Sequence, residues 1–511
     1  MAQNAGSVRR RKLGGVDDLV QSTRKGNAVD TYLYIDNEAR GASDGGTFVR
    51  RSPVSGEAVT HGAAAKARDA VAAVESAQRA FATWSQTGPG QRRGLLLRAA
   101  DEIENRTEEF VTAMKGEVGA GDLWARFNVL LAANVFREAA AMTTQIQGRS
   151  IPSDKPGTLS LTVRQPVGVI LSIVPWNGPI VLAARAIAYP LMCGNTVVFR
   201  ASETSPKTHA LVAESVYAAG FPAGTLNFVT NDPKDAPEVI ETMIAHPAVR
   251  RVNFTGSTSV GRIIGEKCGR HLKRCILELG DKSPMIVLRD ADIDGAVNAT
   301  IFGAFLYQGQ ICMSTERVIV EEPIADAFVE KLAARAAELQ AGDPRSQTAC
   351  ALGPVVSQGA ADRLNALLDD ALEKGAKIRA GGPAQGTLMP ATVLDGVTSK
   401  MRIYAEEAFG PILQVIRVKD ADAAVHVAND TEYGLSAAVF SNDVTRALDV
   451  AMRIQTGSVH INGATVANEA QAPYGGTKAS GWGRFDSQAV IEEFTELKWL
   501  TFEQPSQRYP L

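Results

Sequence analysis

Short apolar segments alternate with long amphipathic segments along most of the 511-residue chain, and this alternation limits the folds open to it. Apolar residues recur at helical spacing at Val71, Val74, Phe81 and Trp84, and again between residues 328 and 339. The strand-like apolar runs are residues 167–175, 196–200, 226–229, 252–254, 285–288, 318–322 and 458–462. Strands that alternate with helices build βαβ units with buried parallel strands. The sequence therefore predicts an α/β protein with two mostly parallel sheets.

The length of the chain indicates how many domains it forms, and its charge indicates which partners it can bind. A chain this long exceeds what one hydrophobic core usually organises, so two large domains are expected. Apolar residues make up 45% and charged residues 21%, as in soluble globular proteins. The formal net charge of −3 provides no general attraction to nucleic acid or to an anionic membrane. We expect neither as a partner.

The cysteines and the N-terminal segment bear on the compartment. Five cysteines form no CxxC pair and are odd in number: Cys193, Cys268, Cys275, Cys312 and Cys350. This usage predicts a reduced, cytoplasmic protein without a disulfide framework or a metal site. The N-terminus is basic, but no apolar signal-peptide core follows it, so residues 1–30 are predicted to be a flexible tail. The longest apolar run, 179–193, is shorter than the about 20 residues of a membrane span.

Four stretches carry residues that suit catalysis, and each has a structural alternative. Cys312 in "FLYQGQICMSTERVIV" is either a buried filler or a nucleophile. The Gly-rich turn in "RVNFTGSTSVGRIIGEKCG" either binds a phosphate at a helix N-terminus or only connects a strand to a helix. Glu278 in "LELGDKSP" is either a structural charge, paired with a group such as Lys282, or a general base with a raised pKa. "YAEEAFGPILQVI" is either functional or a charged loop entering a strand.

Two further polar residues follow predicted strands, where α/β proteins build their sites. Asn177 in "VPWNGP" either donates its amide to a developing oxyanion or closes a local turn before Pro179. Glu203 follows another strand and suits ribose hydroxyls. Elsewhere, residues 160–166 and 494–504 alternate apolar and polar side chains, which predicts a small antiparallel sheet or edges offered to a second subunit.

Seven motifs in this order resemble the aldehyde dehydrogenase superfamily: "PWN", "FTGSTSVG", "ELGDKSP", "GQICMSTER", "EEAFGP", "NDTEYGLSAAVF" and "PYGGTKASGWGR". The resemblance covers roughly Tyr32 to the C-terminus. It implies two Rossmann-like domains with a small antiparallel bridging sheet. The implied NAD-binding domain comprises residues 31–147 and 167–278, the catalytic domain 279–480, and the bridging and oligomerisation segments 148–166 and 481–511. It also implies a homodimer or a homotetramer.

The resemblance also implies a mechanism. Cys312 is similar to the family's nucleophile, Asn177 and the Cys312 N–H to its oxyanion donors, and Glu278 to the base that activates water against the thioester. Glu278 and Cys312 are 312 − 278 = 34 positions apart, as in the hydrolytic members. Members that acylate coenzyme A generally lack this glutamate, so a free acid is the expected product.

For the cofactor, the resemblance assigns Gly256 and Ser257 to the pyrophosphate, Val260 to the adenine, Glu203 to the adenine ribose, and Glu407 with Phe409 to the nicotinamide side. The full implied set is Ile173, Val174, Pro175, Trp176, Arg200, Ser202, Glu203, Gly256, Ser257, Val260, Leu279, Gly280, Glu407 and Phe409. The Glu203 carboxylate favours NAD. NADP stays possible, because Arg200, a lysine in most of the family, suits a 2′-phosphate.

Within the superfamily, the chain is most similar to the branch that oxidises aromatic aldehydes: salicylaldehyde, vanillin and benzaldehyde dehydrogenases. The substrate residues that this implies are Trp124, Gly178, Arg185, Ile311, Met313 and Tyr474. Gly178 leaves room for a ring, Trp124 and Tyr474 can stack on it, and Arg185 can attract a phenol oxygen or a ring carboxylate. Trp124 as a core aromatic and Arg185 as a structural ion-pair partner are the alternatives.

One residue departs from the family pattern. Asp281 stands where the family usually has a second glycine, and it is expected either to disturb Glu278 or to pair with Lys282. Three rival functions stay open: a dehydrogenase for aliphatic aldehydes or semialdehydes, a cofactor-free Cys–Glu hydrolase, and a structural protein that kept the fold.

Overall fold

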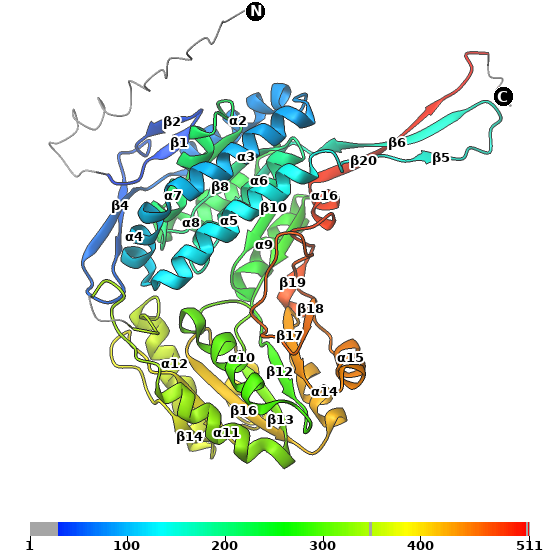
Figure 1. Cartoon of the computed structure of the whole chain (residues 1–511). Helices are drawn as coiled ribbons and strands as arrows, with labels where there is room; N and C mark the ends of the chain where they lie inside the picture. The colour runs from blue at the N-terminus through cyan, green and yellow to red at the C-terminus, as the bar shows by residue number, and fades with distance from the viewer. Residues whose placement is uncertain (1–28, 347–349, 507–508, 510–511) are drawn as a thin grey trace, which may run out of the picture.

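The computed structural model describes residues 29–346, 350–506 and 509. The predicted tail of residues 1–30 therefore lies, except for its last two residues, outside the described part of the chain. The described residues form two lobes, each built on one large sheet, and an arm that projects from the upper lobe (Figure 1).

The upper lobe contains an eight-stranded sheet. Its strands, in spatial order, are β19 (Gly481–Trp482), β11 (Arg274–Glu278), β10 (Val249–Thr255), β7 (Val169–Ile173), β8 (Thr196–Arg200), β9 (Leu226–Val229), β1 (Leu33–Ile35) and β2 (Glu38–Arg40). The five strands from β11 to β9 are parallel, and the strands at both edges are antiparallel. Every residue of β7, β8 and β9 is buried, as expected for central strands covered on both faces.

Helices cover both faces of this sheet. One face packs under α3 (Pro89–Asn105), α4 (Thr107–Val118), α5 (Asp122–Met142), α6 (Pro179–Met192) and α7 (Pro206–Ala218). The other packs under α2 (Ala67–Trp84), α8 (Ala236–Ala245), which follows η1 (Pro233–Asp235), and α9 (Thr258–Arg270). Neighbouring strand residues alternate between the two cores: Val197 and Phe199 lie in one, and Val198 lies in the other.

The lower lobe contains a seven-stranded sheet, parallel except for one edge strand. Its spatial order is β14 (Lys377–Ala380), β15 (Thr392–Asp395), β16 (Ile412–Val418), β13 (Arg317–Glu321), β12 (Pro284–Val287), β17 (Ser436–Phe440) and β18 (Ser458–Ile461). One face packs under α10 (Ile293–Phe305) and α11 (Glu322–Ala337), and the other under α12 (Gln358–Glu373), α13 (Arg402–Ala405), α14 (Ala421–Asn429) and α15 (Val444–Met452). The predicted α/β class with two mostly parallel sheets is confirmed. None of the helices in the described ranges is both long and apolar enough to cross a bilayer.

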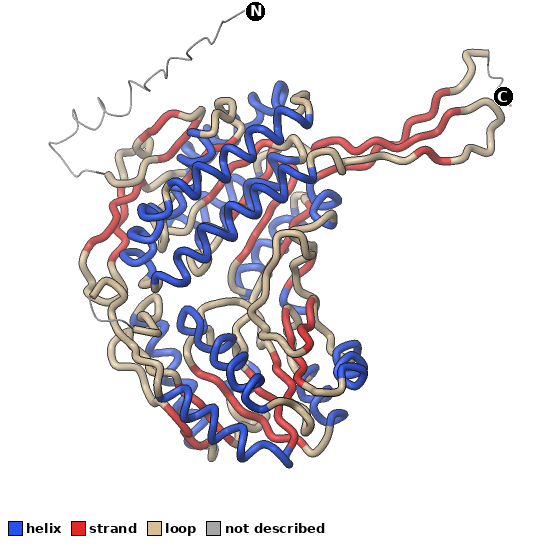
Figure 2. Tube along the Cα trace, in the orientation of Figure 1, coloured by secondary structure: helices blue, strands red, loops and turns tan. Residues whose placement is uncertain are grey.

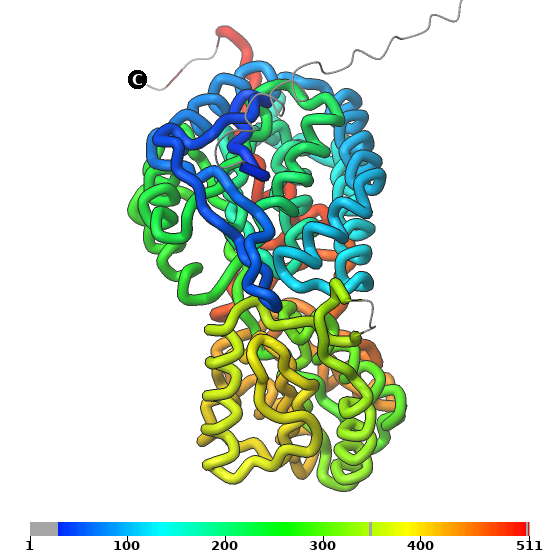
Figure 3. The backbone as a smooth tube through the Cα atoms, turned by 90° about the vertical axis from the view of Figure 1, so that its left-hand side faces the viewer, coloured from blue at the N-terminus to red at the C-terminus, as the bar shows by residue number. Residues whose placement is uncertain are grey.

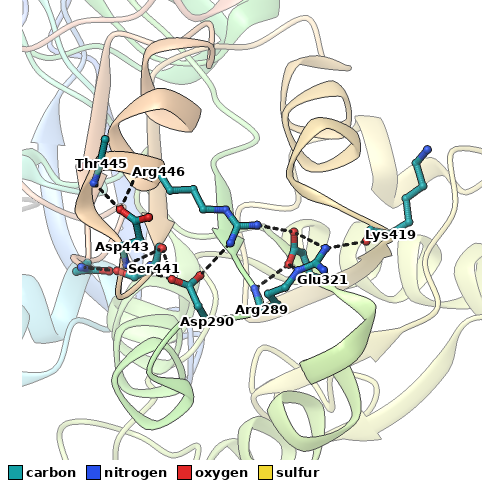
Figure 4. A network of polar contacts seen from close by, with 9 residues as sticks. Arg289, Asp290, Glu321, Lys419, Ser441, Asp443, Thr445 and Arg446 are labelled. Atoms are coloured by element: carbon teal, nitrogen blue, oxygen red, sulfur yellow. Dashed lines mark hydrogen bonds and ion pairs between the residues drawn. The ribbon is translucent and has the colours of Figure 1, made fainter.

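A polar network fastens the strand ends of this lower lobe (Figure 4). Glu321, whose side chain is fully buried at the end of β13, accepts hydrogen bonds from the backbone N–H of Arg289 at 2.8 Å and from its Nε at 2.6 Å. Arg446 of α15 lies between Glu321 and Asp290, at 3.6 Å and 3.7 Å. These contacts hold the ends of β12 and β13 against α15.

Two smaller sheets connect the lobes and form the arm. The hairpin of β3 (Thr47–Arg51) and β4 (Ala58–Ala63) runs from the upper towards the lower lobe (Figure 3), where Arg50 donates to the carbonyl oxygen of Val356. The arm consists of β20 (Thr495–Phe502), β6 (Leu159–Pro166) and β5 (Ser150–Ile151), and it extends away from the body (Figure 2). β20 follows α16 (Ala489–Phe494) and pairs antiparallel with β6, which confirms the pairing predicted for residues 160–166 and 494–504. Within the segment predicted to bridge subunits, β19 instead extends the upper sheet.

Candidate active site

The residues singled out from the sequence gather where strands of both sheets end. Glu278 is the last residue of β11, and Asn177 lies between β7 and α6. Cys312 lies in the loop between η2 (Leu306–Gly309) and β13. In parallel sheets, the loops after strand C-termini meet at one edge, which is the usual place for a site.

The backbone before Cys312 is unusually bent. Tyr307 and Gln308 have φ angles of 49° and 54°, a left-handed conformation that is costly for residues other than glycine. Surrounding contacts hold it, because the Gln308 side chain donates to the carbonyl oxygen of Pro354 at 3.0 Å. At Gly309, an added Cβ would lie 2.4 Å from the carbonyl oxygen of Gly410. Close approach of the backbone therefore requires glycine here, and the loop is fixed in place.

Three polar side chains meet at the nucleophile candidate. The hydroxyl oxygen of Tyr474 lies 2.9 Å from Cys312 Sγ and 3.3 Å from Glu278 Oε1. Burial raises the pKa of Glu278 to about 7 and raises the pKa of the Cys312 thiol well above its usual value. Among the described residues, Glu278 Oε2 is buried without a hydrogen-bond partner, so it is available to a water molecule. Glu278 makes none of the contacts with Lys282 that its structural alternative required.

Asn177 reaches across to the loop of Cys312. Its Nδ2 donates to the carbonyl oxygen of Gln310 at 3.1 Å, two residues before the cysteine. Its own carbonyl oxygen accepts from the indole N–H of Trp124 at 2.9 Å. An amide nitrogen carries two protons, so the second one can serve an oxyanion. The side chain does not close the local turn that was its alternative.

An apolar cavity ends at Cys312. Its lining contains all six residues predicted for the substrate: Trp124, Gly178, Arg185, Ile311, Met313 and Tyr474. Other lining residues had escaped prediction: Leu123, Phe127, Leu131, Val181, Leu182, Phe302, Leu306, Val466 and Asn468. The cavity has a volume of about 130 Å³. An engineered cavity of about 150 Å³ binds benzene, so an aromatic ring is of the right size.

Arg185 lines this cavity, but its guanidinium is already paired. Its Nη2 lies 2.9 Å from Asp486 Oδ2, with 4% and 0% of the two side chains exposed. The guanidinium carbon also lies 4.3 Å from the centre of the Tyr474 ring. The alternative interpretation, a structural ion pair, describes these contacts. The attraction of Arg185 for a phenol oxygen or a ring carboxylate stays a prediction, and Asp486 would weaken it by offsetting the charge.

Cys312 also lines a second cavity, which lies between the ends of upper-sheet strands and the lower-lobe residues Arg363, Glu407 and Phe409. It shares Asn177, Leu182 and Cys312 with the apolar cavity. Eight of the residues predicted for the cofactor line it: Pro175, Trp176, Gly256, Ser257, Leu279, Gly280, Glu407 and Phe409. The remaining six lie outside this lining. They are Ile173 and Val174, buried at and just after the end of β7, Arg200 at the end of β8, Ser202 and Glu203 after it, and Val260, exposed on α9. Arg363, which had escaped prediction, also lines it and donates to the carbonyl oxygens of Glu407 and Ala408.

The second cavity has groups that suit a phosphate and a ribose of a nicotinamide cofactor. α9 begins beside Ser257, and a helix N-terminus favours a phosphate. At Gly280, an added Cβ would lie 2.7 Å from Glu407 Oε2, so the backbone must approach this carboxylate closely. Burial raises the pKa of Glu407 to about 8. A buried carboxylate of this kind gains from ribose hydroxyls that donate to it.

Burial raises the pKa of Glu278 and the charge of Asp281 adds to that rise, so the expected effect on Glu278 is present, while the expected pair with Lys282 is not. The Asp281 carboxylate accepts from the backbone N–H groups of Leu435 and Ser436, at 3.0 and 3.1 Å, and from the hydroxyl of Ser283. Lys282 pairs with Glu316 instead. The expected pair between Asp281 and Lys282 is therefore wrong: Asp281 fastens its loop to the start of β17.

Comparisons with known proteins agree with this geometry. The profile of the Aldehyde dehydrogenase family matches residues 41–500. A salicylaldehyde dehydrogenase of Pseudomonas putida is 59% identical over 94% of this chain and 100% of its own. A vanillin dehydrogenase of Pseudomonas fluorescens is 52% identical over the same shares.

Solved structures give the same result. The crystal structure of a salicylaldehyde dehydrogenase from Pseudomonas putida G7 complexed with salicylaldehyde superposes with a TM-score of 0.94. It is 57% identical, over 95% of this chain and 100% of that one. A betaine aldehyde dehydrogenase from Staphylococcus aureus in complex with NAD+ has a TM-score of 0.90. It is 32% identical, over 94% of this chain and 96% of that one. The matched family profile, the near full-length identity and the shared fold lead to one conclusion: the chain belongs to the aldehyde dehydrogenase family.

Proposed function

We propose that this enzyme oxidises an aromatic aldehyde, of the salicylaldehyde, vanillin or hydroxybenzaldehyde type, to the carboxylic acid with NAD. One observation carries the proposal: Cys312 lines both a ring-sized apolar cavity and a second cleft, which also contains Glu407 and the turn at Gly256 and Ser257. The relatives that act on salicylaldehyde and vanillin support the aromatic class. A cofactor-free hydrolase would have no use for the second cleft.

The first half of the reaction uses Cys312 and Asn177. The thiolate of Cys312 adds to the aldehyde carbonyl and forms a thiohemiacetal. The free amide proton of Asn177 and the backbone N–H of Cys312 stabilise the oxyanion, and such donors contribute about 3–4 kcal/mol each. A nicotinamide held in the second cleft would supply the acceptor for the hydride of this carbon. A thioester on Cys312 remains.

The second half uses Glu278. Its unpartnered Oε2 is positioned to accept a proton from water, which then attacks the thioester and releases the acid. Glu407 and the N-terminus of α9 would hold the nicotinamide ribose and the pyrophosphate. Gly178 and the aromatic rings of Trp124 and Tyr474 select a flat ring, because the cavity wall beside the cysteine is apolar and open.

The substrate class is tested by following reduced nicotinamide by absorbance with a panel of benzaldehydes and hexanal. Hydroxylated benzaldehydes should be the better substrates, and Cys312→Ala should be inactive. A Gly178→Phe variant should lower kcat/KM for benzaldehydes by about tenfold or more relative to hexanal, because the added ring occupies the cavity. Preference for hexanal, with no selective effect of Gly178→Phe, would favour the aliphatic alternative.

The pH dependence follows from Glu278. Only the carboxylate accepts a proton from water, and its pKa is raised to about 7, so kcat should rise as the pH increases through about 7. A Glu278→Gln variant should lose this rise and about 10²–10⁴-fold in kcat. Steady-state rates across the pH range measure both effects. Turnover at the wild-type rate in this variant would remove Glu278 from the mechanism.

The choice of NAD over NADP depends on Arg200 and Glu203. The Arg200 guanidinium donates to Glu203 Oε2 at 2.8 Å and to Asn231 Oδ1 at 2.9 Å, so it is already engaged. A 2′-phosphate would also meet the Glu203 charge. Glu203→Gln should therefore improve kcat/KM for NADP relative to NAD by about tenfold, since one like charge is removed. Glu214→Gln, on α7, is a matched control, and an unchanged ratio in Glu203→Gln would contradict this assignment.

We further propose that the arm joins subunits into a homodimer or homotetramer, in the cytoplasm that the cysteine usage indicates. Leu497, Trp499 and Phe502 expose 57%, 68% and 57% of their surface on β20, more apolar area than an isolated arm favours. The double variant Leu497→Asp/Phe502→Asp should shift the mass measured by light scattering towards that of one chain. The control Leu272→Asp, at an exposed leucine away from the arm, should not. An unchanged mass in the double variant would show that the arm does not join the subunits.

A further inference from the structure

We propose that Tyr474 is a catalytic residue: its hydroxyl relays the proton of the Cys312 thiol to Glu278 and then donates to the thiolate. The inference rests on the proposed role of Cys312 as nucleophile. It differs from the expectation that Tyr474 only stacks on the substrate ring.

The geometry places one hydroxyl between the two reacting groups. Tyr474 Oη lies 2.9 Å from Cys312 Sγ and 3.3 Å from Glu278 Oε1. A phenol has one proton, so it donates to one neighbour while its oxygen accepts from the other. With a neutral thiol and an ionised Glu278, the hydroxyl donates to the carboxylate and accepts from the thiol.

Shifting both protons by one bond creates the nucleophile. The S–H bond of Cys312 breaks as its proton moves to Tyr474 Oη. The former Tyr474 proton moves to Glu278 Oε1. The products are a thiolate, a neutral tyrosine and a neutral carboxylic acid, so atoms and charge balance and no electron is exchanged. Glu278 then releases this proton to solvent, which restores the carboxylate that accepts a proton from water in the second half of the reaction. The new O–H of Tyr474 faces sulfur, and a hydrogen bond to an ionised acceptor is a strong one.

The surroundings keep the phenol in this position. The backbone N–H and carbonyl groups of Tyr474 and Phe485 bond to each other in both directions, at 2.8 and 2.7 Å. Arg185 lies over the Tyr474 ring, and Asp486 holds Arg185. Two charged groups face the thiol and the phenol: Glu278 from β11 and Arg185 from α6. Burial and Glu278 raise the pKa of Cys312, and the Tyr474 hydroxyl acts in the opposite direction.

Direct transfer is the competing route, because Glu278 lies close enough to the thiol to raise its pKa. In that case Tyr474 and Glu278 would act independently. In a relay, removing either one breaks the same path, so their effects on thiol reactivity would not add.

The test is the pH dependence of Cys312 alkylation by iodoacetamide, measured without aldehyde or cofactor. Tyr474→Phe keeps the ring and removes the hydroxyl. We expect alkylation at neutral pH to slow by about tenfold, with the profile shifted to higher pH, because one hydrogen bond to the thiolate is lost. In steady-state assays with an aromatic aldehyde, kcat should fall while KM changes little. Tyr34→Phe, which removes a distant hydroxyl bonded to Glu214, should change neither.

Two further outcomes decide the matter. The double variant Tyr474→Phe/Glu278→Gln should be slowed by less than the product of the two single effects, because both variants interrupt one path, and slowing by the full product would overturn the relay. If Tyr474→Phe leaves the alkylation profile unchanged and raises KM, Tyr474 only lines the cavity and contacts the substrate, and the relay is overturned. Loss of aromatic oxidation in an enzyme whose Cys312 still reacts through Tyr474 would instead contradict the proposed substrate class.

Discussion

The arrangement depends on burying a thiol, a phenol and a carboxylate against one another. Removing such groups from water costs free energy unless each finds a partner, and a charge costs most. Here the hydroxyl of Tyr474 lies within hydrogen-bonding distance of both Cys312 and Glu278, and burial raises the pKa of Glu278 to about 7. The same burial that destabilises the charged forms makes the carboxylate a suitable base near neutral pH. Burial therefore lowers the stability of the charged groups at the point where the two cavities meet, and the same burial gives Glu278 its suitability as a base.

The rest of the fold holds that point rigid. Parallel strands of the upper sheet deliver Glu278 and Asn177, and the loop before β13 delivers Cys312 from the lower sheet. Left-handed backbone at Tyr307 and Gln308 persists because side-chain and backbone contacts from Pro354 and Gly410 enclose it. The ion pair of Arg185 and Asp486 supports the ring of Tyr474, and Asp281 fastens the loop after Glu278 to β17. Asp281 stands where the resemblance to the family leads one to expect a glycine. Its contacts leave Glu278 at the end of β11.

The sequence predicted the parts of the molecule that depend on local pattern. Alternating segments gave the two parallel sheets, and apolar–polar alternation gave the pairing of β6 with β20. Motifs identified residues that the structure brings to the two cavities. Contacts between distant segments escaped, because no local pattern encodes them: Arg185 and Asp486 are 301 positions apart, and Asp281 and Leu435 are 154 apart. The apolar residues Leu123, Phe127 and Leu131 on α5 also escaped, since their helical spacing is that of any amphipathic helix.

The most direct measurement would trap the covalent intermediate. The wild-type enzyme would be mixed with an aromatic aldehyde and NAD, quenched in acid within its first turnover, and digested for mass spectrometry. The account predicts an acyl group on the peptide that contains Cys312, formed together with one equivalent of reduced nicotinamide, and its absence when NAD is omitted. Reduced nicotinamide without an acylated Cys312, or an acyl group on another residue, would contradict the account.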